Sequence, residues 1–166
     1  MKMTELKPGS KAPDFTLSTD GGGEMSLASL KGKKAVLYFY PKDDTPGCTK
    51  ESCDFRDNLK SFEKLNAAVI GISKDSPQSH DKFKTKYALN FPLASDEDGK
   101  VCEAYGLWVE KNNYGKKYMG IQRSTFLIDE QGNIAHVWRN VKVEGHVEEV
   151  RQCASVSVRQ FNKLSY

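Results

Sequence analysis

Short apolar runs alternate with longer amphipathic stretches along this chain, a pattern that predicts a sheet covered by helices. Ala35–Tyr40 and Ala67–Ser73 are apolar, aromatic and β-branched runs of the kind found in strands buried on both faces. Pro46–Leu65, between them, has the spacing of a helix. The three segments therefore form a β-α-β unit whose two strands are expected to be parallel.

Two hairpins are expected outside this unit. Asp14–Leu17 and Glu24–Leu27 flank a glycine-rich turn near the start of the chain. Ser124–Asp129 and Asn133–Trp138 flank Glu-Gln-Gly and have the apolar and β-branched composition of paired strands.

Further helices are expected in the second half of the chain. One opens at Ser76, directly before a proline, and runs to about Leu89; a short one covers Asp98–Tyr105; another begins at Glu144. After about Arg151 the residues alternate as in a strand, which weakens the helix prediction there. With no repeat or linker, residues 1–166 are expected to form one α/β domain, a mixed central sheet flanked by helices with an N-terminal β-hairpin.

Composition and charge exclude several classes of protein. The chain has 166 residues, enough for one domain with a core, and its net charge of +3 (25 basic, 22 acidic) is dispersed. Dispersed charge argues against nucleic acid or an anionic membrane as the main partner. No apolar run approaches the roughly 20 residues of a membrane span, and the N-terminus lacks the apolar stretch of a secretory signal. We therefore expect a cytoplasmic protein.

Most of the cysteines and histidines carry no strong chemical signal. Structural disulfides are rare in the cytosol, so Cys102 and Cys153 are expected to be small buried hydrophobic residues. His80, His136 and His146 lack the spacing of a metal site, with one another or with the cysteines, and are expected on the surface or in helices.

Cys48 is different because of its place in the predicted fold. It follows a strand and a turn, and it lies where the helix from Pro46 begins. A thiol there meets unpaired backbone N–H groups and the positive end of the helix dipole, and both favour the thiolate. Cys53 lies five residues further on. A disulfide between them is possible, and the pair outlines a redox site.

Helical geometry separates the two thiols. At about 100° per residue, the side of the helix that carries Cys48 also carries Ser52 and the large apolar residues Phe55, Leu59 and Phe62, so it is expected to face the sheet. Cys53 lies about 140° around, on the solvent side. The two Cα atoms are about 8.6 Å apart in an intact helix, whereas a disulfide requires less than about 7 Å. The pair is therefore expected to bond only if the first turns of the helix unwind.

Three residues near Cys48 each allow two interpretations. Thr45 precedes Pro46 in the N-cap position, so its hydroxyl either caps the helix or bonds to the sulfur or a bound oxygen. Pro41 either only ends the strand or also shields the thiolate from water. Position alone favours the structural interpretation of both. Glu51 is either a first-turn acid favoured by the dipole or a carboxylate that orients a distant arginine.

The segment PKDDTPGCTKESC resembles the active-site segment of peroxiredoxins. Pro41, Thr45 and Cys48 stand in the pattern Pro-x3-Thr-x2-Cys. The Cys-x4-Cys spacing and the flanking CDFRD are similar to the bacterioferritin comigratory protein, or peroxiredoxin Q, subfamily. Residues 9–17, 91–108 and 120–134 also resemble blocks of that subfamily, so the resemblance covers most of the chain.

The resemblance implies a thioredoxin-like fold and a monomeric antioxidant thiol peroxidase that reduces hydrogen peroxide and organic hydroperoxides. Cys48 would be the peroxidatic cysteine, which becomes a sulfenic acid. Cys53 would be the resolving cysteine, which closes an intramolecular disulfide that thioredoxin or a similar dithiol reduces. Arg123 would support the thiolate and polarise the peroxide, Thr45 would contact the substrate oxygen, and Pro41 would cover the pocket. This chemistry requires no metal or organic cofactor.

Two other classes of protein remain possible on the residues alone. A thiol–disulfide oxidoreductase or redox sensor usually carries Cys-x2-Cys at the helix start, a shorter spacing than the one here. A binding or structural protein would use Cys48 and Cys53 to hold zinc, although two thiols without a nearby histidine make a weak set of zinc ligands.

Overall fold

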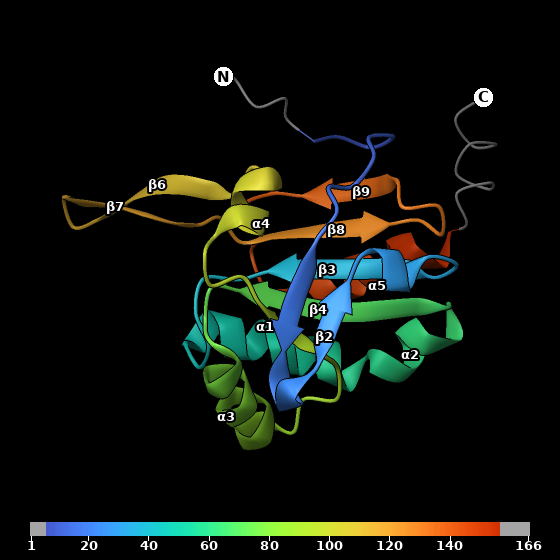
Figure 1. Cartoon of the computed structure of the whole chain (residues 1–166), viewed down its shortest axis with the longest axis horizontal. Coiled ribbons are helices and arrows are strands. Elements are labelled where there is room, and N and C mark those ends of the chain that lie inside the picture. Colours follow the sequence, from blue (N-terminus) through green and yellow to red (C-terminus); the bar gives the residue numbers. More distant parts are fainter. Residues whose placement is uncertain (1–5, 157–166) are drawn as a thin grey trace.

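A mixed sheet of seven strands forms the centre of the molecule (Figure 1). The computed structural model describes residues 6–156. In spatial order the strands are β2 (Glu24–Ser26), β1 (Thr16–Thr19), β5 (Leu93–Ser95), β4 (Ala67–Ser73), β3 (Lys34–Phe39), β8 (Ser124–Ile128) and β9 (Ile134–Trp138).

The strands β3 and β4 pair in parallel at the centre of this sheet, as the β-α-β pattern predicts. Val36 is in register with Val69, and nearly every side chain in both strands is buried. Continuous burial explains why these sequences are apolar throughout instead of alternating with polar residues. The predicted hairpins β1–β2 and β8–β9 are also present, and β8 runs antiparallel to β3.

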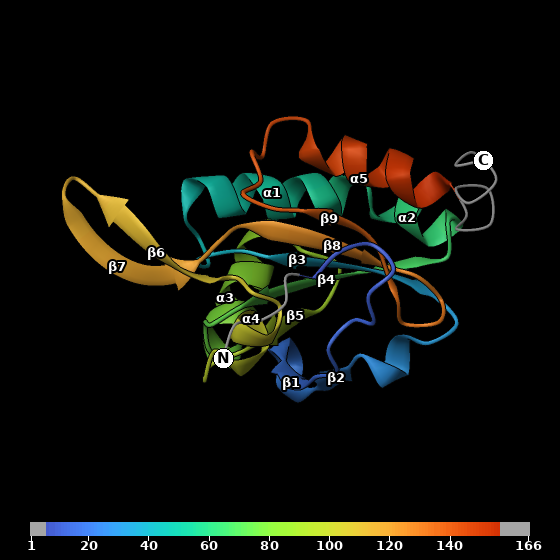
Figure 2. The same ribbon diagram turned by 90° about the horizontal axis from the view of Figure 1, so that it is seen from above.

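Helices cover both faces of the sheet (Figure 2). On one face lie α1 (Pro46–Asp57), α2 (Leu59–Lys64) and α5 (His146–Ser155), and α4 (Lys100–Ala104) packs on the opposite face. The helix α3 (Pro77–Tyr87) packs along β5 and the turn of the N-terminal hairpin. Ser76 caps it as the sequence suggests, because the hydroxyl of Ser76 accepts from the N–H of Ser79 at 3.1 Å.

A buried hydrogen bond fixes α1 on the sheet. The hydroxyl of Tyr38 in β3 lies 2.8 Å from that of Ser52 in α1. A Cβ at Gly71 of β4 would approach the Tyr38 hydroxyl oxygen to 2.7 Å, so only glycine leaves room for this contact. Phe55 stacks on the Tyr38 ring with centroids 4.6 Å apart. The helix face predicted to pack on the sheet therefore does so.

The single helix predicted over 46–65 is wrong at one residue, Asn58. The chain leaves helical geometry there, with φ −107° and ψ 6°, and the segment divides into α1 and α2. The side-chain amide of Asn58 donates to the carbonyl of Asp54 at 2.8 Å. This bond takes the acceptor that the backbone N–H of residue 58 would use in a continuous helix, a competition typical of asparagine.

Three strands were not predicted. The strand β5 has three residues and follows a proline, so its pattern is too short to recognise. The other two, β6 (Trp108–Asn113) and β7 (Lys116–Ile121), form a hairpin that projects from the body (Figure 1). Tyr114, at its tip, is fully exposed. Because little of this hairpin is buried, lysines and asparagines interrupt the apolar positions that would have signalled strands.

The strand-like alternation after about Arg151, which weakens the helix prediction, does not interrupt the helix within the described residues. Residues 152–155 continue α5, because Val147, Val150 and Ala154 recur at helical spacing and are all buried. The rest of that predicted segment, 157–166, lies outside the described residues. No helix within 6–156 is long and apolar enough to cross a membrane.

Candidate active site

Cys48 lies in the first turn of α1, where the sequence predicts it. Strand β3 ends at Phe39, a loop turns the chain, and Pro46 opens the helix. Cys48 is 1% exposed and packs in the apolar cluster that contains Phe55. All four cysteines are free thiols. The sulfur of Cys48 is therefore shielded and lies where backbone N–H groups at a helix start have no helical acceptor.

Arg123 reaches this sulfur from the segment between β7 and β8. Its Nη2 donates to Cys48 Sγ at 3.2 Å, and its Nη1 donates to Glu51 Oε1 at 2.7 Å. The Glu51 side chain is fully buried, whereas that of Arg123 is 17% exposed. The fold thus joins a thiol, a guanidinium and a carboxylate from distant parts of the sequence into one chain of contacts.

Glu51 holds the guanidinium in place, which favours the second of its two interpretations. Burial raises the pKa of Glu51 to about 7, and the Arg123 charge opposes that rise. The interaction between the two side chains favours the charged form of each. The net rise of the Glu51 pKa therefore comes from burial, which removes water from the carboxylate. Its second oxygen, Oε2, has no hydrogen-bond partner within the described residues.

Gly47 leaves the space that the guanidinium occupies. A Cβ at this position would lie 3.1 Å from Nη2 of Arg123. Sequence reasoning missed this role, although the glycine directly before Cys48 is a visible signal. It also missed Lys111 of β6, a second cation near the site. Burial lowers the pKa of Lys111, the charge of Arg123 lowers it further, and Cys48 acts in the opposite direction.

Thr45 occupies the N-cap position, but its side chain makes no capping hydrogen bond. The capping interpretation is therefore wrong for the hydroxyl: Oγ1 donates instead to the carbonyl of Lys42 at 2.9 Å. The backbone carbonyl of Thr45 accepts the N–H of Thr49 and so begins the helix. Pro41 is half-buried at the start of the same loop.

Cys53 lies on the partly exposed side of α1 and has no contact with Cys48. The helix is continuous from Pro46 to Asp57, the arrangement in which the predicted disulfide is too long. Burial raises the pKa of the Cys53 thiol; Asp57 and Asp54 also raise it, against the opposing charge of Arg56. The two sulfurs diverge around the helix, which also argues against one zinc ion held by both.

Two of the three histidines lie in helices, which is one of the two expected locations, and both are buried. His80 is in α3 and His146 begins α5, and both side chains lie in the interior. Nε2 of His146 lies 2.8 Å from the hydroxyl of Thr125, beside the rings of Phe55 and Trp138. Burial lowers the pKa of His146 to about 4, so this ring is a neutral support for β8 near Arg123. The sequence positions of the three histidines follow no pattern from which their burial could have been predicted.

Comparison with known proteins gives matches over most of the chain. The model of the AhpC/TSA family matches residues 8–137. A putative peroxiredoxin bcp of Coxiella burnetii is 61% identical over 145 residues, covering 87% of this chain and 96% of that protein. The peroxiredoxin Bcp of Bacillus subtilis is 54% identical over 147 residues, covering 89% and 94%.

A solved structure of the Xanthomonas campestris bacterioferritin comigratory protein has a similar fold. It superposes with a TM-score of 0.82 at 42% identity, covering 92% of this chain and 97% of that one. That structure is described as a trapped intermediate/ligand complex bearing on alkyl peroxide reduction activity. The match confirms the predicted thioredoxin-like α/β fold.

Proposed function

Because the chain belongs to the Bcp/peroxiredoxin Q subfamily of the AhpC/TSA peroxiredoxins, we propose that it reduces hydrogen peroxide and alkyl hydroperoxides at Cys48. One observation carries the assignment of this residue: the guanidinium of Arg123 donates to the Cys48 sulfur at 3.2 Å. A fixed cation beside a shielded sulfur at a helix start favours the thiolate, which is the reactive form.

In the proposed first step, the Cys48 thiolate attacks the terminal oxygen of the hydroperoxide and the O–O bond breaks. The sulfur is oxidised by two electrons to a sulfenic acid. The remaining alkoxide or hydroxide takes a proton from water and leaves as alcohol or water. Arg123 and the N–H groups of α1 are the donors available for the charge that develops on the leaving oxygen.

In the proposed second step, the Cys53 thiolate attacks the Cys48 sulfur. The S–O bond breaks, hydroxide leaves as water after protonation, and a disulfide forms. Unwinding of the first turns of α1 serves this step twice. It brings the two sulfurs within bonding range, and it removes the burial that raises the pKa of Cys53 in the folded helix.

Recycling then requires a dithiol, and we propose thioredoxin or a similar protein for this role. Exchange of its thiolates with the Cys48–Cys53 disulfide restores both thiols and leaves the reductant oxidised. A reduced dithiol pool is a property of the cytoplasm, so we propose that the protein acts there. We also propose, from the family resemblance, that it acts as a monomer.

Mass spectrometry after one equivalent of hydrogen peroxide tests this function. We expect an internal Cys48–Cys53 disulfide in the native chain, a stable Cys48 sulfenic acid in Cys53→Ser, and no reaction in Cys48→Ser. Cys102→Ser is the matched control, because Cys102 is fully buried in a different cluster and should change nothing. Consumption that stops after one equivalent despite added thioredoxin would indicate a redox sensor instead.

A further inference from the structure

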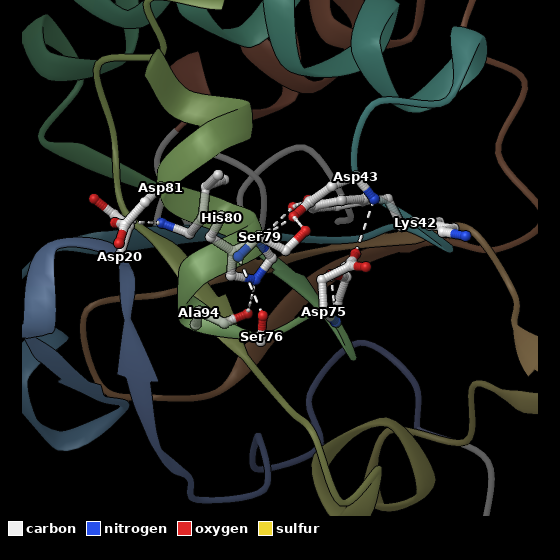
Figure 3. Close-up of polar contacts among 12 residues, drawn as sticks. Asp20, Lys42, Asp43, Asp75, Ser76, Ser79, His80, Asp81 and Ala94 are labelled. Carbon is white, nitrogen blue, oxygen red and sulfur yellow. Dashed lines mark hydrogen bonds and ion pairs between the residues drawn. The ribbon is translucent and has the colours of Figure 1, made fainter. Parts of the chain in front are cut away.

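Asp43, in the loop that leads to Cys48, belongs to a buried hydrogen-bond cluster formed with the start of α3 (Figure 3). Its Oδ1 accepts the Tyr40 hydroxyl at 2.6 Å, and its Oδ2 accepts the Ser79 hydroxyl at 2.8 Å. Nδ1 of His80 lies 2.7 Å from the same Oδ2. The backbone N–H of Asp43 donates to Asp75 at 2.8 Å. Both the side chain and the backbone of this loop residue are therefore fixed.

The ring of His80 faces an acceptor on each side. Nε2 lies 3.1 Å from the carbonyl oxygen of Ala94, and Nδ1 faces the Asp43 carboxylate. His80 is fully buried, so water does not replace either contact. A carbonyl and a carboxylate only accept, so both contacts are satisfied when Nε2 carries a hydrogen and a proton lies between Nδ1 and Asp43.

The other hydrogen bonds in the cluster each have a fixed donor and a fixed acceptor. Burial raises the pKa of Tyr40 well above its usual range, so its hydroxyl stays protonated and donates to Asp43. Asp75 Oδ2 accepts the N–H of Asp43 and also the hydroxyl of Ser73 at 2.6 Å. Both carboxylate oxygens of Asp43 and the Oδ2 of Asp75 therefore already accept hydrogen bonds within the cluster.

A metal ion is the competing occupant. Ligand atoms of Asp43, Asp75 and His80 all lie within 4.8 Å of one another. However, a cation here would have to displace the proton between His80 and Asp43 and compete with the hydroxyls of Ser79 and Ser73 for the same carboxylate oxygens. The contacts fit a proton-linked cluster.

The far end of α3 holds the next loop residue. Asp44 is in the left-handed region, with φ 59°, and it accepts Lys86 at 2.8 Å and the Tyr87 hydroxyl at 2.5 Å. These contacts are exposed, so water and salt weaken them. The buried contact of Asp43 with His80 is therefore the firmer of the two attachments between the loop and α3.

We propose that His80 is a positioning residue for the peroxide reaction, acting through Asp43 on the loop that places Thr45 and Cys48. This inference rests on the function proposed above. The loop determines where the carbonyl of Thr45 begins α1, and hence where the sulfur lies relative to Arg123. A misplacement of about 1 Å in such a site can cost about a hundredfold in rate.

Two substitutions at His80 separate its two contacts. In His80→Asn the amide nitrogen takes the place of Nδ1 and can still donate to Asp43, while the contact with Ala94 is lost. In His80→Gln the amide nitrogen takes the place of Nε2 and can still donate to Ala94, while the contact with Asp43 is lost. Both remove the buried ring, so each serves as the other's control for a loss of packing.

The measurement is the second-order rate constant of Cys48 with hydrogen peroxide in the reduced protein. We expect His80→Gln to lower it by about tenfold or more and His80→Asn to stay within about threefold of the native rate. Equal rates in the two variants, with a reactive native protein, would overturn this inference alone. A native protein inert to peroxide would overturn the proposed function as well.

Nitrogen-15 NMR of the native His80 ring gives a second measurement that needs no variant. We expect Nε2 to carry a hydrogen, and we expect both ring nitrogens to show the chemical shifts of hydrogen-bonded atoms. A chemical shift of Nδ1 typical of a ring nitrogen without a hydrogen bond would overturn the inference, because His80 would then not hold Asp43. Elemental analysis showing one equivalent of a divalent metal lost in Asp75→Asn would overturn it too, since a cation would then link the cluster.

Discussion

Nη2 of Arg123 lies 3.2 Å from Sγ of Cys48, across 75 positions of sequence. The same guanidinium contacts Glu51, a residue of the helix that Cys48 begins. One side chain therefore ties the segment before β8 to the first turn of α1. The surroundings of the Cys48 sulfur therefore depend on how well that side chain is held.

Replacing Arg123 with methionine should slow the reaction of Cys48 with peroxide by about a hundredfold or more, the usual loss when one preorganised donor to a developing charge is removed. Methionine keeps most of the side-chain length but neither the charge nor the donors. Stopped-flow measurement of the peroxide rate tests this. Arg151→Met is the matched control, since it makes the same change at an exposed ion pair on α5. A native rate in Arg123→Met would remove the arginine from the mechanism.

Gly47→Ala should separate stability from activity. Alanine is favoured over glycine in a helix interior by about 1 kcal/mol, a gain that offsets the cost of crowding Arg123, so the variant should fold with close to native stability. Its Cβ would crowd Nη2 of Arg123, and we expect the peroxide rate to fall by about tenfold as the guanidinium shifts. Urea unfolding and the rate constant are measured on the same sample. A stable variant with undiminished rate would show that the guanidinium tolerates the added methyl.

Glu51 should make the protein less stable as the pH rises from about 4.5 to about 7. Its usual pKa is 4.5, and burial raises the value in the folded protein to about 7. Between these limits the folded chain holds a proton that the unfolded chain releases, so folding is favoured at the acid end and that advantage is lost toward pH 7.

The free energy of unfolding of the native protein minus that of Glu51→Gln isolates this contribution. The difference should decrease between pH 4.5 and 7, because glutamine does not titrate. His146 acts in the opposite direction, since burial lowers its pKa to about 4, but it is present in both proteins and cancels. A pH-independent difference would contradict the assignment of the titration to Glu51.

Oxidation should unwind the start of α1. We expect the amides of the first turns of α1 to exchange hydrogen at least about tenfold faster after one equivalent of peroxide, while those of α3 keep their protection. The measurement is hydrogen exchange with mass spectrometry, with Cys53→Ser as the control that cannot close the local disulfide. A Cys48–Cys53 bond with unchanged protection of α1 would refute the distance argument.

The sequence predicts what depends on neighbours along the chain. Cys48 is found at its helix start because a strand, a turn and a proline precede it within a few residues. Glu51 is noticed for the same local reason. That it meets Arg123 is a property of the folded sheet, and only the family resemblance pointed to this arginine.

The features that sequence reasoning missed depend on contacts that no local pattern records. His80 is buried because the start of α3 packs onto the loop that holds Asp43. Gly47 matters because it leaves space for the side chain of Arg123, which is distant in the sequence. The β6–β7 hairpin escaped prediction because it lies outside the core, where burial does not force an apolar alternation.

The division at Asn58 limits how far a local melting event can spread. Because α1 and α2 share no continuous ladder of backbone hydrogen bonds, loss of order at the start of α1 meets a boundary there. Beyond it, Phe62 remains anchored in the interior. In the proposed cycle, oxidation would therefore disrupt one short cooperative unit, and most of the hydrophobic interior would stay intact as a template for refolding.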